Sequence, residues 1–284
     1  MIKAIFFDWF NTLAYYDPPR EELHSRGLKE FGINVSPKEI LPGILAADSY
    51  FFGENAKSPV EKREPRERAE VYRRYQDMIL TEAGVKADEE LLLKIMHKVQ
   101  QLFEGVTFAL YDDVLVTLER LKGRKLILGL LTNATKDMIS IHRKLGLEPY
   151  LDFVVTSEEA GADKPKAPIF KAALQRAGVE ASEAVHVGDQ YKLDVAGARG
   201  VGINPILIDR YEQYPEVSDC PRIRNLSELA RYLELFTASF LSCLGPQDIV
   251  NWCTDVFLGN LAEVEAIDSK TYRYRKGPRT PQQG

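Results

Sequence analysis

Five short, mostly apolar runs are spread along the chain, and in each of them apolar residues occupy consecutive rather than alternate positions. They cover residues 5–7, 126–131, 153–155, 184–187 and 206–208. Consecutive apolar residues predict strands that are buried on both faces, as in a parallel sheet covered by helices. Helix-like segments that end at a glycine, which suits a helix C-terminus, separate the later runs. This alternation predicts an α/β fold with a doubly wound parallel sheet of about five strands.

The segment between the first two runs has a different pattern. Residues 17–110 contain no convincing strand, but amphipathic helical stretches occur at residues 17–32, 64–84 and 87–105. In the last of these stretches, apolar residues recur at helical spacing. The simplest interpretation is a helical insertion that follows the first strand and interrupts the sheet domain.

The chain is therefore expected to divide into three parts. Residues 1–16 and 109–235 would form the sheet domain, and residues 17–108 the helical insertion. After about residue 235 the alternating pattern weakens, and the chain ends in a basic segment rich in polar residues. Residues 236–284 are expected to form a C-terminal extension that is helical at first and then disordered.

The bulk composition restricts the class of partner. The chain has 284 residues, a formal net charge of −5 at pH 7 and a pI of about 5.6, so it has no general attraction for nucleic acid or anionic membranes. A small molecule is the expected partner. Cys220, Cys243 and Cys253 are odd in number and lack CxxC spacing, which favours a reducing compartment over disulfides or zinc. Because the sequence shows no secretory signal and no run of about 18 apolar residues, the cytoplasm is the expected location.

Polar and charged residues follow four of the predicted strands, at the point where each strand ends. They are Asp8 after the first strand, Thr132 and Asn133 after the second, Lys164 beyond the third, and Asp189 and Asp194 after the fourth. Ligands of doubly wound sheets bind outside the carboxyl ends of the strands. These side chains are therefore expected to gather at one edge of the sheet and to form a site there.

Each of these residue types has a role in phosphoryl transfer. Asp8 could attack phosphorus and form an aspartyl phosphate, which divides one difficult hydrolysis into two easier steps. Thr132 could hold a phosphoryl oxygen while Lys164 offsets the negative charge at the reacting centre. Asp8 and Asp189 could bind Mg²⁺, which would bring the attacking carboxylate and the anionic phosphate together. The pattern indicates Mg²⁺-assisted hydrolysis of a small phosphorylated molecule.

The order and spacing of these motifs resemble the haloacid dehalogenase superfamily of aspartate-nucleophile hydrolases, in the subgroup with a helical cap after the first motif. The four motifs are DWFNTL with Asp8 and Thr12, LLTN with Thr132, DKPKAPIF with Lys164, and HVGDQYKLDVAGARGVG with Asp189 and Asp194. The resemblance covers about residues 1–235. It implies a Rossmann-like core, a mobile cap formed by residues 17–108, bound Mg²⁺ and usually hydrolysis of a phosphomonoester.

The resemblance also implies roles for individual residues. Asp8 corresponds to the nucleophile, and Thr132 and Lys164 to further catalytic residues. Thr132, Asn133 and Lys164 are expected to bind the phosphorylated substrate. Within the predicted cap, further candidates to face the site are Phe51, Phe52, Lys62 and Arg63.

The metal ligands are expected to come from the first and fourth motifs. Asp8, the backbone carbonyl of Phe10 and Asp189 would hold Mg²⁺, and Asp194 would either bind it directly or orient another ligand. All of these groups offer oxygen atoms, which are the ligands that Mg²⁺ prefers. The resemblance therefore predicts a magnesium site between the first and fourth motifs.

Phe10 is the main departure from the family pattern. Phosphatases of the family usually have a second aspartate at this position, which protonates the leaving oxygen and later activates water. Because phenylalanine can do neither, we expect slow turnover, a preference for good leaving groups and accumulation of phosphorylated Asp8. His24, Tyr15 or Tyr16 could replace the missing acid from the cap side.

Two other functions stay open. Metal-independent 2-haloacid dehalogenases of the family have tyrosine at the position of Phe10, and a halide leaves without protonation. Gly188, Asp189 and Asp194 disfavour this function, because dehalogenases typically have serine and asparagine in place of the glycine and the first aspartate. The chain could also be a catalytically weak or inactive protein that binds a phosphorylated metabolite or a partner chain.

Overall fold

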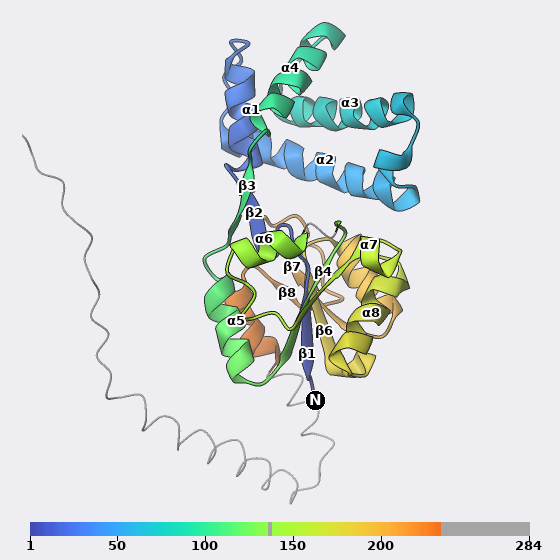
Figure 1. The fold of residues 1–284 in the computed structure, drawn as a ribbon. Coiled ribbons are helices and arrows are strands. Elements are labelled where there is room, and N and C mark those ends of the chain that lie inside the picture. Colours follow the sequence, from blue (N-terminus) through green and yellow to red (C-terminus); the bar gives the residue numbers. More distant parts are fainter. Residues whose placement is uncertain (136–137, 234–284) are drawn as a thin grey trace, which may run out of the picture. The chain divides into compact units, whose positions relative to one another are not determined.

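A computed structural model of the protein describes residues 1–135 and 138–233, and its largest sheet is parallel (Figure 1). Its six strands lie in the order β5-β4-β1-β6-β7-β8, and all neighbouring strands run parallel. The strands are β1 (Ala4–Phe7), β4 (Ile127–Thr132), β5 (Phe153–Thr156), β6 (Ala184–Gly188), β7 (Asn204–Ile208) and β8 (Arg222–Ile223). The chain extends first to one side of β1 and then to the other, so the predicted doubly wound fold is confirmed.

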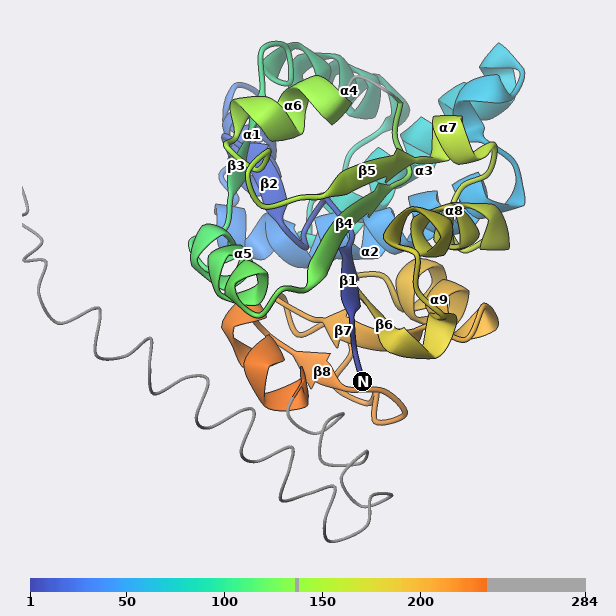
Figure 2. The same cartoon turned by 60° about the horizontal axis from the view of Figure 1, so that its bottom comes forward.

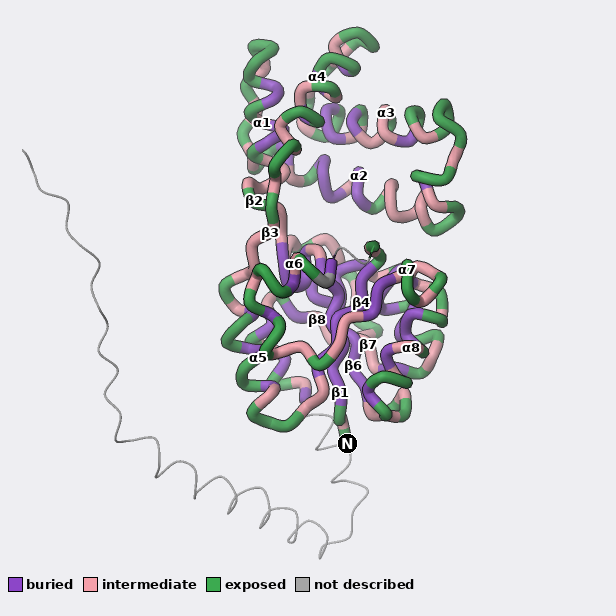
Figure 3. The backbone as a smooth tube through the Cα atoms, in the orientation of Figure 1, coloured by how far each residue is buried: buried purple, intermediate pink, exposed green. Residues whose placement is uncertain are grey.

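All five predicted apolar runs coincide with strands of this sheet, and only Leu126 lies outside, directly before β4. Every residue of β1 has 0% exposure, as expected for a strand that is covered on both faces. Helices α5 (Val114–Gly123) and α8 (Ala167–Ala177) lie on opposite sides of the sheet (Figures 1 and 2). Buried residues accordingly concentrate along the strands (Figure 3). The sixth strand, β8, has only two residues and is too short to produce an apolar run in the sequence.

Shorter helical elements lie between and after the strands of this sheet. They are α6 (Met138–Lys144), α7 (Ser157–Ala160), a π-helical turn (Tyr191–Val195) that continues into α9 (Ala196–Gly200), and two 3₁₀ turns (Ala181–Glu183 and Leu226–Glu228). Gly178 ends α8 with a φ of 63°, a left-handed conformation that glycine adopts without strain. Among the described residues, no helix is long and apolar enough to cross a membrane.

The insertion consists of helices α1 (Arg20–Lys29), α2 (Pro37–Lys57), α3 (Pro65–Glu82) and α4 (Glu89–Leu102), with a 3₁₀ turn at Val60–Lys62. Apolar residues from all four helices form a separate core. Helices α2 and α3 approach closely at Gly43, where an added Cβ would lie 2.7 Å from the backbone oxygen of Ile79. Ser36 and Glu39 cap the start of α2, since the Ser36 N–H donates to the Glu39 carboxylate at 2.8 Å.

Two short strands connect these helices to the sheet domain (Figure 1). β2 (Ala14–Asp17) and β3 (Thr107–Leu110) are antiparallel, with Ala14 opposite Leu110. The prediction that residues 17–110 contain no strand is therefore wrong at β3. This strand lacks a clear polar and apolar alternation, and it forms because the distant β2 offers a pairing partner.

The part of the chain from Met1 to Leu233 forms one compact unit. Its division into a sheet domain and a cap at residues 17–108 stays a prediction. The predicted C-terminal extension, residues 236–284, lies outside the described residues.

Candidate active site

The proposed nucleophile, Asp8, lies directly after β1 at the carboxyl edge of the sheet. Its backbone N–H donates to the carbonyl of Val187 in the neighbouring strand at 2.8 Å, which continues the sheet pairing by one residue. The chain then turns sharply: Asn11 has a φ of 58°, and the carbonyl of Trp9 accepts hydrogen bonds from two N–H groups further along. Within this turn the Thr12 hydroxyl donates to Asp8 Oδ2 at 3.4 Å. The turn thus holds the Asp8 carboxylate at the strand end.

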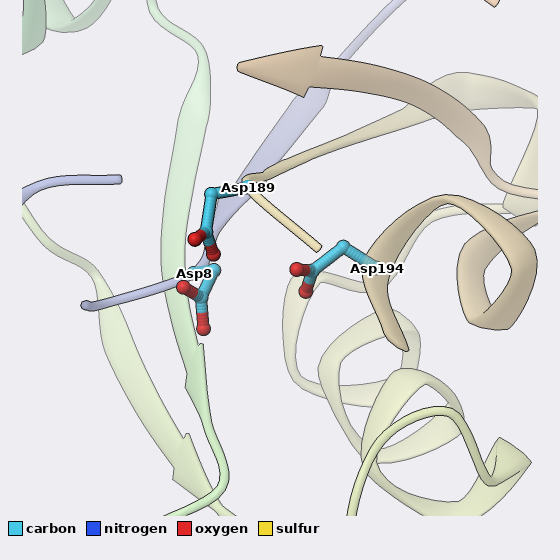
Figure 4. A group of neighbouring side chains, drawn as sticks. All are labelled: Asp8, Asp189 and Asp194. Carbon is cyan, nitrogen blue, oxygen red and sulfur yellow. The ribbon is translucent and has the colours of Figure 1, made fainter. Parts of the chain in front are cut away.

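Three carboxylates meet at this point, from Asp8, Asp189 and Asp194 (Figure 4). Asp189 follows β6, and Asp194 lies in the π-helical turn after it. One oxygen from each carboxylate lies within 4.8 Å of the others, and all three residues are buried. Buried carboxylates this close repel one another, so the cluster requires cations nearby.

Lys164 supplies one positive charge to the cluster. Its Nζ atom lies 2.5 Å from Asp8 Oδ1 and 2.7 Å from Asp194 Oδ1. The lysine side chain is only 3% exposed, and burial alone would lower its pKa. The charges of Asp194 and Asp8 outweigh burial and raise the pKa of Lys164 above its ordinary value. The ammonium group therefore stays charged beside the nucleophile.

Asp194 is held by donors on both of its oxygens. Oδ1 accepts from Lys164 and lies 2.9 Å from Nε2 of the buried His186, and Oδ2 accepts the backbone N–H of Gln190 at 3.0 Å. Burial raises the pKa of Asp194, but the charge of Lys164 and the hydrogen bond with His186 together have a larger, opposite effect, so the pKa lies below its ordinary value. These contacts favour a role in which Asp194 orients Lys164 over one in which Asp194 binds a metal directly.

Asp189 has no lysine or arginine contact in the described part of the chain. Asn11 Nδ2 and Gln190 Nε2 donate to its Oδ2 at 3.3 and 2.9 Å, which leaves Oδ1 for another ligand. Burial, followed by the charges of Asp8 and Asp194, raises the pKa of Asp189 well above its ordinary value. A divalent cation held between Asp189 and Asp8 would relieve this repulsion, so the residues fit Mg²⁺.

Thr132 and Asn133 lie at the end of β4, beside the same cluster. Thr132 is buried, with 5% exposure. The Asn133 side chain accepts the Lys164 N–H at 2.7 Å and donates to the Lys164 carbonyl at 3.2 Å. Asn133 thus fixes the backbone that carries Lys164, a role beyond the predicted binding of substrate.

A cavity of about 470 Å³ opens over these residues. The predicted site residues that line it are Asp8, Phe10, Thr132, Asn133, Lys164, Asp189 and Asp194. The structure therefore brings the whole predicted set together, although the residues come from four separate motifs.

Only some of the candidates that were expected in the predicted cap or on its side of the site line this cavity. Phe51, Phe52 and Tyr16 line it, whereas Lys62, Arg63, Tyr15 and His24 do not. Arg63 binds Glu54 instead, at 2.9 Å. His24 lies 2.8 Å from the carbonyl of Arg20 through Nδ1, and burial lowers its pKa to about 4. Of the proposed substitutes for the missing acid, only Tyr16 lies at the cavity.

Three residues that position the carboxylates were missed in the sequence. Asn11 and Gln190 donate to Asp189, and His186 contacts Asp194. Asn11 lies in the turn after Asp8 and Gln190 directly follows Asp189, but polar residues at a turn are too common to carry a signal. His186 interrupts an otherwise apolar strand, and that interruption is the one signal that could have identified it.

Comparisons with known proteins agree with this arrangement. A sequence model of haloacid dehalogenase-like hydrolases matches residues 2–202. The ribulose-1,5-bisphosphate 5-phosphatase of Halopiger xanaduensis is 40% identical over 106 residues, which are 37% of this chain and 44% of that protein. The glyceraldehyde 3-phosphate phosphatase of Methanopyrus kandleri is 32% identical over 219 residues, which are 74% of this chain and 85% of that protein.

The fold is also found among solved structures. A HAD-hydrolase structure from Bacillus subtilis covers 82% of this chain and 98% of its own chain, with a TM-score of 0.58 and 19% identity. At this identity the likeness concerns the fold alone. The chain spans less than two thirds of the length of several curated relatives, including 44% of the Halopiger protein.

Proposed function

The chain belongs to the haloacid dehalogenase-like hydrolases, and from this membership we propose that it is a Mg²⁺-dependent phosphatase of small phosphorylated metabolites. The observation that carries the proposal is the 2.5 Å contact between Asp8 Oδ1 and Lys164 Nζ, next to the buried carboxylate of Asp189. The Halopiger and Methanopyrus relatives are named as phosphatases of ribulose-1,5-bisphosphate and glyceraldehyde 3-phosphate, which supports this reaction class.

Asp8, Asp189 and the backbone carbonyl of Phe10 would hold Mg²⁺. The proposal is supported by the oxygen-only donor set and by a charge imbalance, because three carboxylates, those of Asp8, Asp189 and Asp194, face one lysine among the described residues. When bound, Mg²⁺ would offset the charge of the phosphoryl oxygens and so allow an anionic nucleophile to approach them. Asp194 would act through Lys164 and the backbone of Gln190.

The reaction divides into two displacements at phosphorus. An oxygen of Asp8 attacks phosphorus, the bond from phosphorus to the substrate oxygen breaks, and the leaving oxygen keeps the electron pair. Lys164 and the Thr132 hydroxyl stabilise the charge on the phosphoryl oxygens. Water then attacks the aspartyl phosphate and releases inorganic phosphate, which regenerates Asp8. The balance is one phosphomonoester and one water converted into one alcohol and one phosphate.

Phe10 determines which substrates react well under this proposal. A positioned acid or base contributes about 10²- to 10⁴-fold, or about 3 to 5 kcal/mol, to a proton-transfer step. Phe10 offers no proton, so the leaving oxygen must depart as an anion or take its proton from water. Substrates with good leaving groups should react faster, and phosphorylated Asp8 should accumulate because its hydrolysis lacks a base.

The dehalogenase alternative is less well supported. A metal-independent dehalogenase would bring an anionic haloacid next to Asp8 and Asp189, and burial of Asp189 would strengthen the repulsion. The phosphatase proposal removes this repulsion, because a cation between the two carboxylates is part of it. An inactive binding protein would keep the site but show no turnover.

Phosphate release from acetyl phosphate, with and without Mg²⁺, is the experiment that separates these functions. We expect Mg²⁺-dependent release that Asp8→Asn abolishes, together with an acid-stable, hydroxylamine-sensitive phosphoenzyme in the unchanged protein. Halide release from 2-chloropropionate that a chelator does not affect would instead identify a dehalogenase. No release from either compound would overturn both hydrolytic functions and leave the binding protein.

A further inference from the structure

Aromatic rings form a large part of the cavity lining next to the carboxylate cluster. We call six of them the aromatic wall: Phe10, Tyr16, Phe51, Phe52, Tyr72 and Phe108. These residues come from the turn after β1, from strands β2 and β3, and from helices α2 and α3. The wall therefore forms only when segments that lie far apart in the sequence come together.

The rings of the wall pack in two groups. Tyr16 has its ring centroid 4.8 Å from that of Phe10 and 4.9 Å from that of Phe108. Phe51 lies 6.1 Å from Phe52 and 5.8 Å from Tyr72, again between centroids. All of these side chains are only partly buried, so apolar ring surface faces the cavity. Such a surface favours an apolar ring over a polyhydroxylated chain, which would lose hydrogen bonds to water.

The positive charges of the cavity lining are already paired. Among the described residues, Arg20 and Lys164 are the only lysine or arginine residues that line it. Arg20 binds both oxygens of Asp48, at 2.8 and 2.5 Å, and also donates to the Tyr75 hydroxyl at 3.2 Å. Lys164 contacts the carboxylate cluster. Within the described part of the lining, a second phosphate or a carboxylate on the substrate would therefore find no unpaired cation.

We propose, on the basis of the proposed function, that the substrate is an aryl phosphomonoester with one anionic group, whose ring binds against the aromatic wall. A cavity of about 470 Å³ accepts a ring of this size together with a phosphoryl group. The class differs from the phosphorylated sugars for which two relatives are named.

Phe10 connects this substrate class to the chemistry, because it both contributes a ring to the wall and replaces the proton donor. When the bond from phosphorus to the aryl oxygen breaks, the electron pair stays on that oxygen and the phosphoryl group moves to Asp8. A phenol has a pKa of about 10, far below that of an alcohol, so the aryl oxide can leave without a protein acid and then take a proton from water. The ring that limits alkyl substrates thus suits aryl substrates.

The test must separate binding of the ring from leaving-group quality. Benzyl phosphate and glycerol 1-phosphate both release an alkoxide when the bond from phosphorus to oxygen breaks, but only benzyl phosphate carries a ring. We expect kcat/KM for benzyl phosphate to exceed that for glycerol 1-phosphate at least about 10-fold, and phenyl phosphate to exceed both. Equal values for benzyl phosphate and glycerol 1-phosphate would overturn the inference.

Acetyl phosphate distinguishes the two levels of the proposal, because it has no ring that could bind against the wall. Mg²⁺-dependent turnover of acetyl phosphate without a preference for benzyl phosphate would overturn only the aromatic substrate class. Absence of acetyl phosphate turnover would overturn the proposed function, and the substrate class with it.

A variant locates the preference in the wall. Phe51→Ala should lower the ratio of kcat/KM for benzyl phosphate to that for acetyl phosphate by roughly 3- to 10-fold. The matched control is Phe31→Ala, since Phe31 is 36% exposed and lies outside the cavity lining. An unchanged ratio in Phe51→Ala would contradict the inference. If that variant does not fold, phenylphosphonate should still inhibit the unchanged protein more strongly than methylphosphonate, and equal inhibition would contradict the inference.

Discussion

Replacing Phe10 with aspartate should introduce a proton donor two residues after the nucleophile. If Phe10 limits the reaction by lacking a proton, hydrolysis of an alkyl phosphate should accelerate within the range of about 10²- to 10⁴-fold that a positioned acid or base contributes. The substitution also removes ring contacts with Tyr16, at 4.8 Å, and with the guanidinium of Arg20, at 4.8 Å. Loss of these contacts should reduce the free energy of unfolding by about 1 to 3 kcal/mol.

The position of Arg20 decides where in this range the gain should fall. At roughly 5 Å and an effective dielectric constant of about 20, the guanidinium would stabilise an introduced carboxylate by about 3 kcal/mol, or about two pKa units. Asp48 already pairs with Arg20 and offsets part of this attraction. At neutral pH a carboxyl with a lowered pKa is almost entirely ionised, so little of it can donate a proton to the leaving oxygen, whereas nearly all of it can accept one from water, although as a weaker base. We therefore expect about 10²-fold for departure of the alkoxide and a larger gain for hydrolysis of phosphorylated Asp8.

The assay is rapid-mixing kinetics with glycerol 1-phosphate and acetyl phosphate, followed by quantification of the phosphoenzyme. Phe10→Asn is the matched control, because it removes the same ring and introduces a side chain of the same shape without a proton to transfer. In Phe10→Asp the phosphoenzyme should no longer accumulate, whereas in Phe10→Asn it should persist. If both variants show the same rates, a missing acid at residue 10 is not what limits turnover.

Three further predictions concern stability. Burial lowers the pKa of His24 to about 4, so between about pH 6.5 and pH 4 the unfolded chain binds a proton that the folded chain does not. As the pH falls through this range, the free energy of unfolding should decrease by up to about 3 kcal/mol relative to that of His24→Gln. If the free energies of unfolding of the two proteins change with pH in parallel, the shift is refuted. Gly188→Ala should lower the free energy of unfolding by about 1 to 3 kcal/mol, because an added Cβ would lie 2.2 Å from Asp194 Cγ. Gly123→Ala is the control and should not lower it, because a Cβ added there meets nothing within 4 Å. Equal melting temperatures for the two variants would contradict this prediction. Mg²⁺ at about 100 times its dissociation constant should stabilise the protein by about 2.7 kcal/mol, measured as a rise in Tm. Asp189→Asn should lose most of this rise. A Tm that Mg²⁺ does not change in the unchanged protein would argue against the metal site.

The sequence by itself determined the sheet and the position of most site residues along it. Consecutive apolar residues such as Ile5, Phe6 and Phe7 have few alternatives to a strand covered on both faces, because exposing them on either side would cost burial energy. Once the strands are parallel, their carboxyl ends share one edge, and residues that follow them, such as Asp8 and Asp189, must approach one another. Local chemistry and one topological rule were sufficient for this part of the prediction.

Pairing between distant segments decided what the sequence could not show. Strand β3 forms only because β2 lies beside it, and β8 is too short to have a pattern of its own. Asn133 was expected to face substrate, yet its amide also holds the backbone of Lys164, which depends on a loop 31 residues away.

The lining of the cavity is another feature that depends on contacts between distant segments. Tyr72 and Phe108 carry no signal in the sequence, and each would suit a helix or strand core equally well. They belong to the aromatic wall because tertiary packing places them at the same cavity as the carboxylate cluster. Periodicity reports which face of an element is apolar, whereas the surface that this face meets is set by contacts between elements that no local pattern encodes.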